Sequence, residues 1–412
     1  KKLLLRLPNE SLDPGSPTGK TAAAPQEQQA ASTFTATVYA ADDYFNPYEP
    51  SQGMSPDVWL ELSTPYGTAG TTVTLTVGST NYPVHILAAS SNTLVNAKTE
   101  NASYVQASTR VVVVPNLPTK LQLLLPGQNP LPGSYSGYSG AVSDLAAGTT
   151  YWATVNLVDD YYNLEAATST FVSEAALVYP IVRLILSDPN IGPRGFLPVG
   201  EAALISGARQ FSFIPATRTC PACSPSLPKL SAQVVDTQQT STNYASTTTA
   251  AINVAPGPTR NLQMLLPGTV NELPSEGSLA GKTGSPGPFT AGNQYQITLR
   301  ATDSYWNRTA DNMQVGLVSN DLYASTPAWS TLIISAGEKV TTIPDAFIPR
   351  TATTTATGGP GLALTLTDEQ FFALATATAS GFTVNAKPFA KVMTLLPGET
   401  HMPGKPPYDT GV

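Results

Sequence analysis

Residues 151–163 read YWATVNLVDDYYN, and this stretch decides the fold. Apolar side chains occupy every second position from Tyr151 to Leu157, and the positions between them are mostly polar. An alternation with period two predicts a β-strand that has one face on a core and the other in water. The strand then runs into a polar turn, Asp-Asp-Tyr-Tyr-Asn at 159–163.

The same strand and turn occur at two other places in the chain, in the same phase. The turns read DDYFN at 42–46 and DSYWN at 303–307. The apolar positions of the strands before them are Phe34, Ala36, Val38 and Ala40, then Tyr295, Ile297, Leu299 and Ala301. Three copies in one phase predict three equivalent strands in three repeats.

Two more motifs recur around this strand. A Leu-rich run ending in proline comes before it, and it occurs a fourth time near the C-terminus: KLLLRLPN to Pro8, KLQLLLPG to Pro126, NLQMLLPG to Pro267 and KVMTLLPG to Pro397. A third motif follows the turn, as LSTPYG from Leu62, LSDPNI from Leu186 and VSNDLY from Val318. The spacing of the repeats matches whole domains in tandem.

The predicted fold class is all-β. Strand-like runs separated by Gly, Pro, Asn and Asp predict three tandem immunoglobulin-like antiparallel β-sandwich domains plus the first strand of a fourth repeat. We call residues 1–116 repeat 1, residues 117–256 repeat 2, residues 257–387 repeat 3 and residues 388–412 the tail. Repeat 2 carries an expected long insert at about 189–230.

The composition argues against several classes of function and partner. Charged residues make up only 12% of the 412 residues, which disfavours helical surfaces. A net charge of −7 argues against nucleic acid as a partner. No apolar run reaches the roughly 18 residues that a membrane-spanning helix needs, so we expect no membrane insertion. The only histidines are His85 and His401, so a Ser-His-Asp arrangement is not expected, and we predict no enzyme and no cofactor.

The order of these motifs resembles a known family. Leu-rich strand, TAG-type turn at Thr290–Gly292, alternating strand, Asp-x-aromatic-aromatic-Asn turn and SDPN at Ser187–Asn190 are similar to bacterial immunoglobulin-like repeats of the invasin/intimin type. The resemblance covers essentially the whole chain. It implies an extracellular or cell-surface location and a role as a stalk, fibre or adhesin, and it brings no catalytic residues.

Two functional hypotheses follow. The first is a structural subunit of an extracellular bacterial filament or surface stalk, which self-associates head to tail into a polymer through Lys1–Ala30 and Pro388–Val412. The alternative is an adhesin or glycan-binding surface module with a glycan or cell-surface partner. In that hypothesis the contact surface includes the aromatic side chains of Tyr135, Tyr138 and Trp152.

The polar turn is the main candidate site. Its first Asp is in phase with the inward face, so we expect backbone N–H groups of the turn to satisfy it, and the Asn suits an Asx-turn or a left-handed position. Calcium is the alternative, because oxygen ligands gather there. Ser304 replaces the second acid in the third copy. The residues concerned are Asp42, Asp43, Asn46, Asp159, Asp160, Asn163, Asp303 and Asn307.

Cys220 and Cys223 are the only cysteines of the chain. They lie in a Pro/Ser-rich stretch with no βαβ pattern around them, which favours a local disulfide that pins a loop over a redox motif. Free thiols and a metal or redox role are the alternatives. A disulfide here would fit an oxidising compartment.

Overall fold

The computed structural model describes most of the chain. The described residues are 1–48, 55–166, 171, 179–188, 196–219, 228–235, 244–271, 281–324, 332–342, 344–353, 361–370 and 374–408. Within these ranges the regular structure consists of β-strands and contains no helix, so the fold is all-β as predicted. None of the described segments forms a helix of the length and hydropathy that a membrane span requires.

Repeat 1 is a sandwich of two sheets. One sheet has the strand order β1-β3-β7-β5 and the other the order β2-β9-β8-β4-β6. The strands are β1 (Lys2–Arg6), β2 (Gln28–Gln29), β3 (Thr33–Ala41), β4 (Asp57–Leu62), β5 (Gly67–Thr68), β6 (Val73–Thr74), β7 (Ser79–Ile86), β8 (Ser90–Lys98) and β9 (Ala107–Val114).

Repeat 2 has the same arrangement, with main sheets β10-β14-β17 and β16-β15-β18-β19. Its strands are β10 (Lys120–Leu124), β11 (Asn129–Pro130), β12 (Tyr138–Ser139), β13 (Leu145–Ala146), β14 (Tyr151–Val158), β15 (Ile181–Ser187), β16 (Phe196–Ala203), β17 (Ala208–Phe213), β18 (Lys229–Val234), β19 (Thr247–Thr248) and β20 (Val254–Ala255). The range 189–230, expected as an insert, contains β16 and β17. These two strands pair with β15 and β14, so this part of the range belongs to the sandwich.

Repeat 3 follows the same plan, with main sheets β21-β25-β28 and β27-β26-β29-β30. Its strands are β21 (Asn261–Leu265), β22 (Thr269–Asn271), β23 (Lys282–Gly284), β24 (Phe289–Thr290), β25 (Thr298–Thr302), β26 (Met313–Ser319), β27 (Leu332–Ile334), β28 (Glu338–Val340), β29 (Leu362–Asp368), β30 (Ala377–Phe382) and β31 (Val384–Asn385).

Between the described strands the ladders are antiparallel except for one short parallel ladder in each repeat, and isolated parallel bridges join Lys2 to Val105, Lys120 to Ala245 and Asn261 to Ala375. The parallel ladders join β2 to β9, β13 to β20 and β24 to β31. In each repeat the Leu-rich strand pairs with the strand that carries the polar turn, as β1 with β3, β10 with β14 and β21 with β25. The Leu-rich motif and the alternating motif are therefore neighbours in one sheet, which explains why they recur together.

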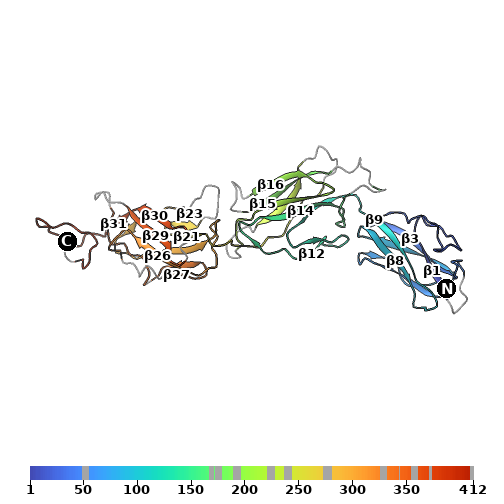
Figure 1. Cartoon of the computed structure of the whole chain (residues 1–412). Helices are drawn as coiled ribbons and strands as arrows, with labels where there is room; N and C mark the ends of the chain where they lie inside the picture. Colours follow the sequence, from blue (N-terminus) through green and yellow to red (C-terminus); the bar gives the residue numbers. More distant parts are fainter. Residues whose placement is uncertain are drawn as a thin grey trace.

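Each repeat encloses its own hydrophobic core. The three buried clusters draw on separate parts of the chain, and the first ends at Val113, the second at Val254 and the third at Val384. Most of the predicted inward positions are buried. Ala153, Val155 and Leu157 are fully covered, as are their equivalents in repeats 1 and 3, whereas Tyr151 and Tyr295 are only partly buried. Figure 1 shows the three sandwiches one after another, with the N- and C-termini at opposite ends of an elongated molecule.

The tail differs from the Leu-rich strands of the three repeats. Residues 388–408 form turns and extended segments, and no strand pairs with them in the described chain. The first strand of a fourth repeat therefore stays a prediction for this segment, because a strand is defined by a hydrogen-bonded neighbour.

Candidate functional site: the joints between repeats

The polar turn is built in the same way in all three repeats. In repeat 2, Oδ1 of Asp159 accepts hydrogen bonds from the backbone N–H of Tyr161 (2.8 Å) and of Asn163 (2.9 Å). Oδ2 of the same carboxylate accepts from the Asn163 side-chain amide (2.8 Å). Asp42 and Asp303 make the equivalent bonds. A carboxylate at the inward end of a strand is thus satisfied by the turn that it starts.

The left-handed residue of this turn is the second aromatic, so of the two conformations expected for the Asn, an Asx-turn or a left-handed position, the left-handed one is not found. Phe45, Tyr162 and Trp306 have φ of 64°, 64° and 63°. A glycine backbone lies against each of these rings. A Cβ on Gly137 would overlap the ring of Tyr162. In the same way, a Cβ on Gly19 would overlap Phe45, and a Cβ on Gly281 would overlap Trp306. Only a residue without a Cβ allows a ring to approach the backbone this closely.

The Asn163 side chain crosses from repeat 2 into repeat 1. Its Nδ2 donates to the Leu87 carbonyl (2.8 Å), and its Oδ1 accepts from the Ala89 N–H (2.6 Å). The linker joins the same network, because the Asn116 N–H donates to Asp159 Oδ2 (2.9 Å). Asn163 is 0% exposed. A buried side-chain amide that pairs with backbone groups of a neighbouring sandwich fixes both the distance and the orientation between them.

The contact between repeats 2 and 3 repeats this design. Asn307 Nδ2 donates to the Ala216 carbonyl (2.6 Å), and its Oδ1 accepts from the Arg218 N–H (3.0 Å). The linker residue Gly257 donates its N–H to Asp303 Oδ2 (2.8 Å). We call each of these contacts a joint, and we call the segments that receive the Asn (87–89 in repeat 1 and 216–218 in repeat 2) the receiving loops.

The third sequence motif holds the receiving loop in shape. In repeat 2, Asp188 accepts from the N–H groups of Ala216 (3.1 Å) and Thr217 (2.9 Å) and from the Thr217 hydroxyl. In repeat 3, Asp321 accepts from Arg350 N–H (2.7 Å), Thr351 N–H (2.9 Å) and Thr351 Oγ1 (2.7 Å). Residues 350 and 351 of repeat 3 are therefore held by Asp321 in the same way as residues 216 and 217 of repeat 2 are held by Asp188.

Glycines allow the sandwiches to approach closely at the joints. A Cβ on Gly133 of repeat 2, where φ is +80°, would lie 2.8 Å from the Ala88 backbone nitrogen of repeat 1. A Cβ on Gly148 of repeat 2 would lie 2.8 Å from the Tyr305 ring of repeat 3. At both joints the backbone of a glycine therefore packs directly against a residue of the neighbouring repeat. Such close packing resists bending.

Two ionisable groups near the joints have shifted pKa values. Burial, with a smaller contribution from the Asp159 carboxylate, raises the pKa of Glu165 to about 7. Its Oε2 is buried and has no hydrogen-bond partner in the described structure. Burial also lowers the pKa of Arg218 in the receiving loop of repeat 2, and the nearby charges of Arg308 and Arg300 act in the same direction.

The other sequence candidates are the two cysteines, the calcium alternative and the aromatic residues of the adhesin hypothesis. Cys220 and Cys223 are outside the described residues. Across the described residues no three acidic, His or Cys side chains gather as a metal site would require. Tyr135, Tyr138 and Trp152 are all exposed.

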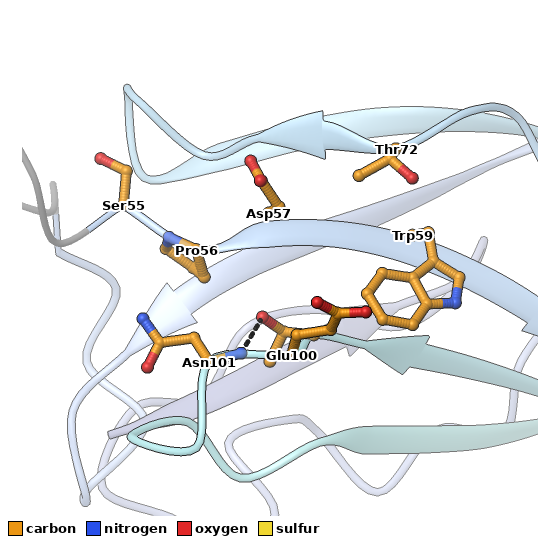
Figure 2. Close-up of a pocket in the computed structure, with 8 residues that line it drawn as sticks. Ser55, Pro56, Asp57, Trp59, Thr72, Glu100 and Asn101 are labelled. Carbon is orange, nitrogen blue, oxygen red and sulfur yellow. Dashed lines mark hydrogen bonds between the residues drawn. The ribbon is translucent and has the colours of Figure 1, made fainter.

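A polar hollow on repeat 1 was not expected from the sequence. It has a volume of about 540 Å³ and lies between β4, the segment before β6 and the β8–β9 connection. Figure 2 shows the lining side chains, which include Asp57, Trp59, Glu100 and Asn101. These residues carry no shared motif, so a reading of the repeats could not identify them.

No family model and no curated protein matches the chain. Among solved structures, the Escherichia coli adhesin FdeC is similar at 12% identity over 88% of this chain and 95% of that chain, with a TM-score of 0.25. Domains 4–9 of the surface-layer protein SbsC are similar at 13% identity over 94% of this chain and 48% of that chain, with a TM-score of 0.18.

A third structure, E. coli alpha-2-macroglobulin activated by porcine elastase, is 10% identical over 94% of this chain and 33% of that chain, with a TM-score of 0.28. This chain therefore spans about a third of that protein. Likenesses at such identities and TM-scores carry no information about function.

Proposed function

We propose that this chain is a rigid spacer, a segment of an extracellular bacterial filament or surface stalk in which locked sandwich repeats set a fixed length. The observation that carries the proposal is the pair of buried Asn side chains, Asn163 and Asn307, which bind backbone groups of the preceding repeat. Independent domains on flexible linkers need no such bonds. A spacer that must stay stiff, by contrast, needs hydrogen bonds between its domains.

Three further features support a mechanical role. The joints use hydrogen bonds from backbone and amide groups, which need no ligand. Each linker is fastened by its own N–H bond to the Asp of the next turn. Charged residues make up only 12% of the sequence, and residues with a preference for strands, such as Thr, stand at outward positions of the repeated strands, which suits an all-β structural protein.

The test is the stiffness of the isolated chain. Small-angle X-ray scattering and single-particle electron microscopy would compare the wild type with the double variant Asn163→Ala/Asn307→Ala. We expect a single extended shape for the wild type and a broad distribution of bend angles for the variant, with unchanged β-sheet content. Asn129→Ala removes an exposed amide outside the joints and serves as the matched control. A double variant as straight as the wild type would refute the proposal.

A second candidate, the glycan-binding adhesin, is favoured by the hollow on repeat 1. An indole ring, two carboxylates and an amide surround a space large enough for one or two sugar rings (Figure 2). A glycan array probed with the wild type and with Trp59→Ala decides this point. Binding that Trp59→Ala abolishes would favour the adhesin, whereas an array without signal would leave the spacer as the proposed function.

A further inference from the structure

Repeat 2 carries a groove on the outer face of its sheet β10-β14-β17. Trp152, Thr154 and Asn156 of β14 line it together with Gln122 of β10, which stands opposite Asn156 in the ladder. Residues of the segment 125–132, which contains β11, form a wall beside these strands. The groove has a volume of about 540 Å³. Sites for small ligands commonly have volumes of about 300–1,000 Å³.

Two buried side-chain amides are held in one orientation in this groove. Asn156 Nδ2 donates to Gln122 Oε1 (3.0 Å), and Gln122 Nε2 donates to the Gly137 carbonyl (2.7 Å). Asn156 is 5% exposed and Gln122 is 4% exposed. The Asn156 Oδ1 accepts no hydrogen bond from any described residue, and it is not among the fully enclosed polar atoms without a partner. This oxygen is therefore a fixed acceptor that opens into the groove.

The wall of the groove is fixed before any ligand binds. The Gln128 N–H donates to the Leu125 carbonyl (3.0 Å), and the Leu125 N–H donates to Gln128 Oε1 (2.9 Å). The Ser143 N–H donates to the Pro126 carbonyl (2.8 Å). The segment 125–132 also contains three prolines, which restrict its backbone. A wall that is already ordered lowers the entropy lost on binding.

The equivalent faces of the other repeats are built differently. At the position of Asn156, repeat 3 has Arg300, which is paired with Glu338, and repeat 1 has Tyr39. At the position of Trp152, the other repeats have Gln and Thr. Trp152 is 58% exposed, so its indole adds little to the core of repeat 2. The sandwich therefore requires neither the indole nor the free amide oxygen at these positions, which points to a ligand.

The chemistry of the groove favours a neutral sugar. None of the described residues that line it carries a charge, so no ion pair would offset the cost of removing a charged ligand from water. The Trp152 indole offers an apolar face to the C–H groups of a sugar ring, and a sugar hydroxyl can donate to the Asn156 oxygen. A proline-rich peptide also suits an aromatic groove. Proline has no N–H, however, so it would leave this oxygen covered and without a donor.

We propose that this groove binds a neutral oligosaccharide, with the Trp152 ring stacked on one sugar and the Asn156 Oδ1 accepting from a hydroxyl. Thr154 lies between them on the strand and adds a hydroxyl that both donates and accepts. The site is separate from the hollow on repeat 1, whose lining includes the carboxylates of Asp57 and Glu100. It would give the spacer a lateral contact with a polysaccharide, which stiffness alone does not require.

A glycan array probed with the full chain tests the proposal. The array carries neutral hexose and N-acetylhexosamine oligosaccharides beside sialylated and sulfated glycans, and we expect the wild type to bind a neutral oligosaccharide. Calorimetric titration with that oligosaccharide should give a Kd raised at least about tenfold in Trp152→Ala. Asn156→Ala should raise it about fivefold, the equivalent of one lost hydrogen bond. Tyr135→Ala removes an exposed ring outside the groove and should leave the Kd unchanged.

The exposed position of Trp152 makes Trp152→Ala the decisive variant, since Asn156 is buried and Asn156→Ala can lower the melting temperature. An array without a neutral signal, or a neutral ligand that binds Trp152→Ala as tightly as the wild type, would overturn the proposal. Binding restricted to acidic glycans and lost in Trp59→Ala would overturn it as well and assign the glycan contact to the hollow on repeat 1.

A decaproline peptide is titrated in parallel. Binding of this peptide in place of the neutral glycans, lost in Trp152→Ala, would overturn the sugar site in favour of a peptide groove. Stiffness is measured by scattering without any ligand, and Trp152→Ala should leave the scattering profile unchanged. The spacer function and the sugar site can therefore fail independently.

Discussion

At the scale of single residues, Asn163 and Asn307 differ from Asn46 because their side chains contact the preceding repeat. All three amides donate to the Asp that begins their turn. Two of them also bind a neighbouring repeat, and these two are fully buried. One side chain therefore closes the turn of its own sandwich and fixes the sandwich before it. This double role explains why an amide, which both donates and accepts, stands at this position.

The buried carboxyl of Glu165 makes the stability of repeat 2 depend on pH. Its pKa is raised to about 7 because burial disfavours the charged form. A carboxyl whose pKa is higher in the folded than in the unfolded protein stabilises the fold at low pH, and this contribution is lost as the pH rises from about 4.5 through 7. At pH 8 we expect Glu165→Gln to stabilise repeat 2 by about 1–3 kcal/mol. Urea unfolding at pH 5 and pH 8 would measure the difference, which should vanish at pH 5; an equal effect at both pH values would contradict it.

At the scale of elements, the strands and their faces could be predicted well because they depend on local periodicity. The alternation on β3, β14 and β25 gives the buried face directly, and the Leu-rich strand is its partner in the same sheet. The polar turn could be placed as well, together with the backbone groups that satisfy its Asp. The left-handed residue could not, since the glycine that admits the ring is distant in sequence, as Gly137 is from Tyr162.

The glycine that faces the turn supports a prediction about this element. Gly137 has φ of +78°, and a Cβ there would overlap the Tyr162 ring. We expect Gly137→Ala to destabilise repeat 2 by about 2–4 kcal/mol, since backbone strain and overpacking add. Gly381→Ala is the matched control, because φ is +81° there and a Cβ would meet nothing within 4 Å. Thermal unfolding of both variants separates the steric clash from the strain, and equal losses would show that the ring contact does not matter.

At the scale of the whole molecule, the repeats can be predicted from the sequence but the joints cannot. The Asn binds backbone atoms of the receiving loops, and any residue supplies a carbonyl and an N–H. Leu87 and Ala216 therefore share no side-chain signature that could reveal the contact. The recurring Asp and Asn of the polar turn indicate a structural role for the turn. The backbone groups that the Asn side chain binds, however, depend on how two consecutive sandwiches are placed relative to each other.

The hydrogen bonds at the joints also allow a prediction of whether the stability and shape of the protein depend on a metal ion. Calcium needs six to eight oxygen ligands. Both oxygens of Asp159 already accept two N–H bonds each, and Asp160 Oδ1 accepts from the Thr119 hydroxyl (2.6 Å). A cation would therefore have to displace the donors that hold the joint together. We expect the melting temperature and the scattering profile to be the same in calcium and in EDTA. A real site at a hundred times its Kd would instead add about 2.7 kcal/mol and shift melting by several degrees. Such a shift, lost in Asp159→Asn, would place a metal at the turn and reassign its carboxylates from the joint to the ion.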